Sequence, residues 1–238
     1  MRSTEPAHSV WLAAALAAIA GFADVLGYLI LSQIFTSHMT GNAARAGLYI
    51  GAGHWAKFML RGMAIPAYVA GVALGFTTER VAVQSGSRIR LAPAFAFELA
   101  LLVAFIFVCR SASIVRPDTS RFYALLWILS VAMGLQSATL RRASGRTVQT
   151  TFMTGMLLNL GQESVEGAFD AAQGRRRPAR RHWSNACVFG GVFLAFALGA
   201  ALGSLAETRF HCLALVLPAA ALGAIIVGEL ARSRTTDG

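Results

Sequence analysis

Two short segments of this chain combine hydroxyl, imidazole and amide side chains with a glycine. The first motif segment, 36–42, reads TSHMTGN and follows Asp24. The second motif segment, 150–161, reads TTFMTGMLLNLG and repeats the Met-Thr-Gly core. Such groups could bind a small polar solute through hydrogen bonds, and a carboxyl group such as Asp24 could take up and release a proton. The sequence therefore predicts a solute site to which both segments contribute.

The predicted solute-binding residues come from the two motif segments and from polar positions in the apolar runs around them. They are Asp24, Thr36, His38, Thr40, Gly41, Asn42, Gln136, Thr151, Thr154, Gly155 and Asn159. No catalytic residue, metal site or cofactor is expected, because the sequence has no HExxH, GxSxG, Walker or GxGxxG pattern. An intramembrane enzyme would need Asp24 and His38 to converge.

Three ionisable residues fall inside apolar runs: Asp24, Arg61 and Glu98. An unpaired carboxylate at membrane depth costs at least a few kcal/mol, so Asp24 is expected to face the protein interior, to be protonated, or to pair with Arg45 or Arg61. Glu98 could pair with Arg61 or belong to a proton path. His38 has no neighbour at metal-ligand spacing, which favours a hydrogen-bonded structural role over a metal ligand.

The rest of the chain is apolar enough to hold these groups in a membrane. Of its 238 residues, 56% are hydrophobic and 13% are charged, about half the charged fraction of a soluble domain. Backbone groups in lipid must be paired within the segment, so long apolar runs predict helices. The fold expected is an all-α polytopic membrane protein: one transmembrane domain, 1–238, with two broken-helix motif segments and six spans at 10–31, 58–76, 91–108, 122–140, 186–206 and 210–228.

The positive charge of the chain, formally +10, lies mainly in the connections. With six spans, the side that carries both termini holds 14 of the 21 Lys and Arg residues and the other side holds six. Basic connections stay in the cytoplasm, so both termini are expected there. The basic loop 162–182 is interpreted as a topology anchor on anionic lipid, and no nucleic-acid partner is expected. The three cysteines are expected to be lipid-facing or packing residues.

An internal repeat is visible without gaps. Residues 54–79 align with 182–207 at an offset of 128 with nine identities, which include His54 with His182, Gly71 with Gly199 and Gly75 with Gly203. The first repeat is assigned to 10–109 and the second to 122–229. With three spans each, the halves would be inverted in the membrane, as in secondary transporters. With four spans each, they would run parallel.

The stretch GFADVLGYLILSQIFTSHMTGN, residues 21–42, resembles the signature GxxDxxGxxxxxxxFxSHMTGN of the YoaK-type bacterial inner-membrane protein family, and TFMTGMLLNLG, residues 151–161, resembles its second element. The resemblance implies a small multi-spanning inner-membrane protein and implies no activity.

From the residues we expect a secondary transporter or permease for a small solute, with Asp24 as candidate proton-coupling group. The alternative is a membrane scaffold or accessory subunit whose motifs serve helix packing. The expected partners are the lipid bilayer, a small solute and a second copy of the chain.

Overall fold

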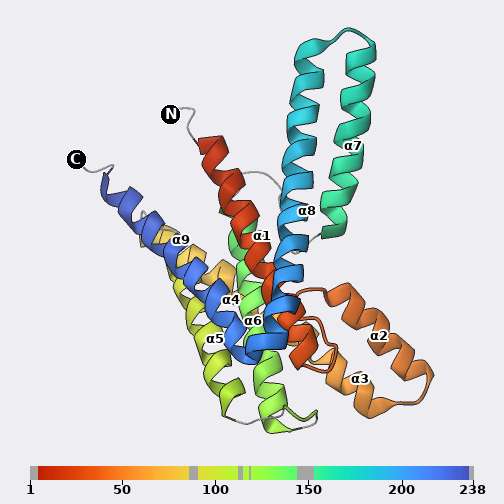
Figure 1. Ribbon diagram of the computed structural model, residues 1–238, viewed down its shortest axis with the longest axis vertical. Helices are drawn as coiled ribbons and strands as arrows, with labels where there is room; N and C mark the ends of the chain where they lie inside the picture. The colour runs from red at the N-terminus through yellow and green to blue at the C-terminus, as the bar shows by residue number, and fades with distance from the viewer. Residues whose placement is uncertain (1–4, 86–90, 112–114, 118, 144–152, 236–238) are drawn as a thin grey trace.

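The computed structural model describes residues 5–85, 91–111, 115–117, 119–143 and 153–235. Every element in these ranges is helical (Figure 1). The elements are α1 (Glu5–Ile30), α2 (Met39–Gly51), α3 (Trp55–Gly62), α4 (Ala64–Gln84), α5 (Ala92–Arg110), α6 (Ser120–Ala143), α7 (Met153–Ala172), α8 (Arg176–Phe210), the short 3-10 helix η1 (His211–Leu215) and α9 (Val216–Thr235).

The long helices form a bundle from which two hairpins project. Figure 1 shows α2 and α3 as a short arm on one side of the bundle and α7 with the first half of α8 as a longer arm, while both termini lie at one end of the molecule. Gly53 and Gly174 adopt φ values of 70° and 72° at the turns of the two hairpins. Glycine has no Cβ, so this left-handed conformation costs it little.

Five stretches are long and apolar enough to cross a membrane: Val10–Ile30, Trp55–Gln84, Ala92–Arg110, Ser120–Thr139 and Arg176–Ala231. The last stretch contains both α8 and α9, between which the chain reverses at His211 with φ 47°. Large apolar side chains are exposed along α8, among them Leu194, Leu198 and Leu205. A bilayer explains this exposure, since lipid tails solvate such side chains as well as a protein core does. The chain is a multi-pass membrane protein.

The structure corrects two expectations about the ends of the helices. The segment 162–182, expected as a loop, is helical except at the turn, because α7 continues to Ala172 and α8 begins at Arg176. Cys109 and Cys212, expected as packing residues, form a disulfide between the last turn of α5 and η1. Their positions at the ends of apolar runs had favoured packing, since a sequence gives no information about which distant helix ends meet.

Two helix pairs make the most extensive contacts, α1 with α8 and α4 with α6. Both contacts depend on glycine. A Cβ at Gly199 of α8 would collide with the carbonyl oxygen of Ala18 in α1, and a Cβ at Gly71 of α4 would collide with that of Val131 in α6. Small residues allow such close backbone approach between helices in membranes. The two pairs fix the positions of the helices that carry the polar residues.

Candidate functional site

Asp24 lies on α1, is fully buried and has both carboxylate oxygens occupied. Its Oδ1 accepts hydrogen bonds from the backbone N–H of Thr36 and of Ser37, each at 2.7 Å, and from the Thr36 hydroxyl at 3.0 Å. Its Oδ2 lies 2.6 Å from Nδ1 of His38. Burial of a carboxylate is costly unless its oxygens are hydrogen-bonded, and the first motif segment supplies all four partners.

The chain reaches Asp24 again because it reverses direction directly after α1. Ser32 and Gln33 have φ values of 52° and 61°, in the left-handed region that few non-glycine residues adopt. Leu31 and Ile34, on either side of them, are fully buried and anchor the turn. The turn brings Thr36 back to the level of Asp24, and α2 then begins at Met39.

Asn42 closes the loop that surrounds Asp24. Its side-chain oxygen accepts a hydrogen bond from the backbone N–H of Phe35 at 3.2 Å, and its amide donates to the carbonyl oxygen of Phe35 at 2.6 Å. Asn42 is buried, whereas Thr40 is exposed and Gly41 lies in ordinary contact with the Phe35 ring. Of the residues predicted from this segment, Thr36, His38 and Asn42 therefore hold the Asp24 network, and Thr40 lies outside it.

His38 connects the buried carboxylate to the surroundings. Its side chain is 32% exposed, against 1% for that of Asp24, and its ring lies between those of Phe35 and Phe196 of α8. The hydrogen bond to Asp24 raises the pKa of His38 above its ordinary value of 6.5; burial opposes this rise and the charge of Asp24 adds to it. The pair can therefore hold a proton at a group that is open to its surroundings.

The two arginines expected to pair with Asp24 bind backbone carbonyls instead. Arg45 donates to the carbonyl oxygen of Gln33 at 2.8 Å, and Arg61 donates to that of Ser32 at 3.2 Å. These carbonyls follow the C-terminal end of α1, where positive charge is favourable. Of the alternatives for Asp24, a position in the protein interior is confirmed and an ion pair with an arginine is wrong, because the arginines stabilise the turn that delivers the hydrogen-bond donors.

The second motif segment lies against the same two helices, α1 and α8. Met156 of α7 is buried with Ala13 and Ala17 of α1 and with Val192 of α8. Gly155 is buried, Thr154 is exposed and Asn159 is half-buried; Thr151 lies outside the described residues. Both motif segments thus contact the pair α1 and α8, the second about two helical turns nearer the N-terminus of α1 than Asp24.

Gln136 of α6 approaches α1 at the level of the second motif segment. It is buried, its amide donates to the carbonyl oxygen of Leu16 at 3.3 Å, and its Oε1 has no hydrogen-bond partner within the described ranges.

Glu98 is elsewhere, on α5, among Phe95, Leu102 and other apolar residues of the main core. Both Glu98 carboxyl oxygens lack a partner in the described part of the chain, so of the two alternatives for Glu98 the pairing with Arg61 is wrong.

A second polar cluster, which the sequence reasoning missed, joins α7 to α8. His182 lies 2.7 Å from Glu163 through Nδ1 and 3.7 Å from Asp170 through Nε2. Asn185 donates to Glu163 at 3.1 Å, and Arg175 pairs with Asp170. The two acids lie two turns apart on one face of α7, which was the available signal. This cluster stabilises the packing of α7 on the first half of α8 in the longer arm.

Comparisons with known proteins find a matching family and a transmembrane relative. A family model described as "Protein of unknown function (DUF1275)" matches residues 12–228. The UPF0700 transmembrane protein YoaK of Bacillus subtilis (strain 168) is 26% identical over 208 residues, which cover 87% of this chain and 88% of that protein. No solved structure matches the chain.

Proposed function

Since the chain belongs to the DUF1275 family and is similar along most of its length to a transmembrane protein, we propose that it is a secondary permease for a small solute, built from two inverted halves and coupled to protons through Asp24 and His38. The alternative is a scaffold in which the same residues serve only packing.

The observation that carries the proposal is that each half packs one of its helices on a helix of the other half. The first helix of each half packs on the glycine-rich helix of the other, α1 on α8 and α6 on α4. The contacts fall at positions related by 113 residues in the first helices and by 128 in the glycine-rich ones: Gly199 on Ala18 and Gly71 on Val131, Gly203 on Phe22 and Gly75 on Leu135, Gly21 on Phe196 and Gly134 on Tyr68. Such reciprocal pairing is the pattern that a two-fold axis produces.

The direction of the helices supports inversion. Gly27 of α1 faces Leu129 of α6, while Leu16 faces Gln136 at the other end, so these equivalent helices run antiparallel. Halves in antiparallel orientation correspond to an axis in the membrane plane, which is the arrangement of many secondary transporters. A packing scaffold has no requirement for this symmetry.

The proposed topology has six spans: α1, α3 with α4, α5, α6, α8 and α9. Figure 1 shows both termini at one end, while α5 and α6 are joined at the opposite end, where the disulfide between Cys109 and Cys212 lies. Disulfides persist on the oxidising side of a membrane, and basic segments stay in the cytoplasm. Both arguments support cytoplasmic termini in a bacterial inner membrane.

The proposed solute site lies along α1 and α8, where both motif segments meet them. His38 is the polar group best placed to contact a bound solute, because its ring is partly exposed, whereas the Asp24 carboxylate behind it is buried. Loss or gain of a proton at His38 would change the charge that a solute meets. Coupling to proton flow then needs no further group.

Catalysis is not proposed, although Asp24 and His38 do converge as an enzyme would need. In a hydrolase of the Ser-His-Asp type, the nucleophile contacts the ring nitrogen that faces away from the acid. The hydroxyl of Ser37 lies 3.2 Å from Nδ1 of His38, the same nitrogen that faces Asp24. This geometry suits a proton-holding pair better than an activated serine.

The test is proton flux in proteoliposomes that contain pyranine, a pH-sensitive dye, with sugars, amino acids, carboxylic acids and metal salts added one at a time. At least one class should move protons through the wild type and several-fold less through His38→Gln. His54→Gln is the control, since His54 is the exposed histidine at the start of α3. Equal flux through all three proteins, or none with any solute, would contradict the proposal.

A further inference from the structure

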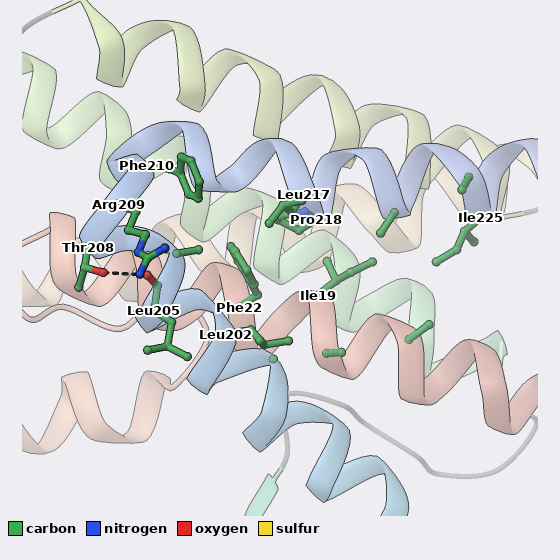
Figure 2. Close-up of a pocket in the computed structure, with 16 residues that line it drawn as sticks. Ile19, Phe22, Leu202, Leu205, Thr208, Arg209, Phe210, Leu217, Pro218 and Ile225 are labelled. Carbon is green, nitrogen blue, oxygen red and sulfur yellow. Dashed lines mark hydrogen bonds between the residues drawn. The ribbon is translucent and has the colours of Figure 1, made fainter.

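A long apolar groove runs between α1, α8 and α9. Its volume is 930 Å³, and apart from Thr208 and Arg209 its lining side chains are apolar. Figure 2 shows Thr208 and Arg209 at one end of the groove, near Phe210, and Ile225 toward the other end. The charged end is the end of α8 that adjoins η1 and the disulfide.

The groove exists because α9 does not pack on α1 as its counterpart α5 packs on α6. Large α5 side chains, Phe95, Leu102 and Phe105, are fully buried in the same core cluster as side chains of α6. Alanines line the groove from both helices, among them Ala18 on α1 and Ala221 on α9. Alanines cannot fill the space that phenylalanine and leucine fill on the other side.

Arg209 has no carboxylate within ion-pair distance among the residues that the structure describes, and it is exposed. Its acidic neighbour Glu207 faces His211 at 3.2 Å instead. The Thr208 hydroxyl donates to the carbonyl oxygen of Leu205 at 2.8 Å, the dashed line in Figure 2. The groove thus presents one unpaired guanidinium at the end of an apolar trough, a combination that matches a phosphate attached to a long hydrocarbon chain.

We propose that this groove is a binding site for an anionic phospholipid, whose acyl chain lies between α1 and α9 and whose phosphate is bound by Arg209. Bulk lipid contacts all apolar faces of the protein, but in this groove a concave apolar surface ends at an exposed guanidinium. The lipid would come from the leaflet at the disulfide end. This inference does not depend on transport.

Native mass spectrometry of the purified, delipidated protein would test the site, with phosphatidylglycerol and the zwitterionic phosphatidylcholine as probes. Phosphatidylglycerol should bind at least tenfold more tightly than phosphatidylcholine to the wild type, and Arg209→Gln should remove that preference. Arg209→Lys should keep most of it. Arg110→Gln is the matched control, because Arg110 ends α5 near the disulfide but lies outside the groove.

Two further measurements distinguish the contribution of the lipid acyl chain to binding from that of the phosphate headgroup. Ala221→Trp fills the groove and should weaken phosphatidylglycerol binding while Arg209 is intact; circular dichroism and gel filtration check that the variant is folded. Glycerol phosphate, which has no acyl chain, should not compete. Equal binding of the two lipids, equal effects of Arg209→Gln and Arg110→Gln, or competition by glycerol phosphate would each overturn the proposal.

Discussion

Asp24 shows how a charged side chain can be held inside an apolar bundle with no cation of fixed charge beside it. Two backbone N–H groups, one hydroxyl and one imidazole surround it, and all come from the seven residues that begin at Thr36. Hydrogen bonds to an ionised group contribute about 1.5–3 kcal/mol each, more than neutral ones. At this scale the first three residues of the motif, Thr36, Ser37 and His38, are the hydrogen-bond partners of one carboxylate.

Replacing Asp24 should therefore destabilise the protein in a graded way. Asp24→Ala leaves two buried backbone N–H groups without acceptors and should lower the free energy of unfolding by about 2–5 kcal/mol. Asp24→Asn keeps one acceptor oxygen and should cost less than the alanine variant. Thermal unfolding in detergent gives the order, and an alanine variant as stable as the wild type would show that the network contributes nothing.

The pH dependence of stability should report on His38. Its pKa is raised in the folded state, so the stabilisation is complete below the unfolded pKa of 6.5 and is lost as the pH rises through the folded pKa. The wild type should accordingly lose thermal stability from about pH 6.5 upward, and His38→Gln should lose less over the same range. Parallel curves for the two proteins would assign the effect to other groups.

At the scale of the helices, glycine decides which faces meet. The contacts of α1 with α8 and of α4 with α6 bring backbone against backbone at Gly199 and Gly71, and no larger residue fits there. These glycines were visible in the sequence as matched positions of the repeat. Their partner helices were not, because glycine specifies a close approach without specifying what approaches.

Glycine-to-alanine substitutions in α8 should distinguish the effect of helix packing on stability from that of helix propensity. Gly199→Ala would force a Cβ against the Ala18 carbonyl and should lower stability by about 1–3 kcal/mol, as overpacking does. Gly191→Ala, in the same helix, has open space around the new Cβ and should be neutral or stabilising, because alanine favours helix by about 1 kcal/mol. Chemical or thermal unfolding of the two variants compares them directly.

The sequence predicted the helical class, the apolar runs and the importance of Thr36 and His38, because hydropathy and unusual polar residues are local signals; it missed Ser37 and included Thr40, which lies outside the Asp24 network. It did not predict the partner of Asp24 or the disulfide. Arg45 and Arg61 were attractive partners by charge alone, yet the left-handed turn at Ser32 and Gln33 directs the imidazole to the carboxylate. Such outcomes depend on the path of the backbone between distant residues.

For the whole molecule, the two proposed halves share their helix pairing but differ in one contact. The third helix of the first proposed half, α5, packs extensively on α6, whereas its counterpart α9 contacts α1 less and leaves the groove. In inverted-repeat transporters the halves exchange roles as the protein alternates between states. The proposed function therefore predicts a second state in which α9 closes on α1.

Cross-linking would detect that state. With Cys187 replaced by serine and the native disulfide kept, Ala18→Cys with Ala221→Cys should be joined by a short bis-maleimide when α9 closes on α1, because the two positions line the groove from the two helices. Ala220, next to Ala221 but outside the groove, gives the control pair with Ala18→Cys. Equal cross-linking of the two pairs, or none with the groove pair at any linker length, would argue against closure.

The disulfide determines how such a movement would be distributed along the helix. It joins the last turn of α5 to η1, the segment that precedes α9, so it restrains the N-terminal end of α9. With 20 residues, α9 is about 30 Å long. A rotation of α9 about the disulfide would displace its C-terminal end most and the Arg209 end of the groove least. The groove would therefore change its width mainly at the end far from Arg209, while the charged end keeps its shape.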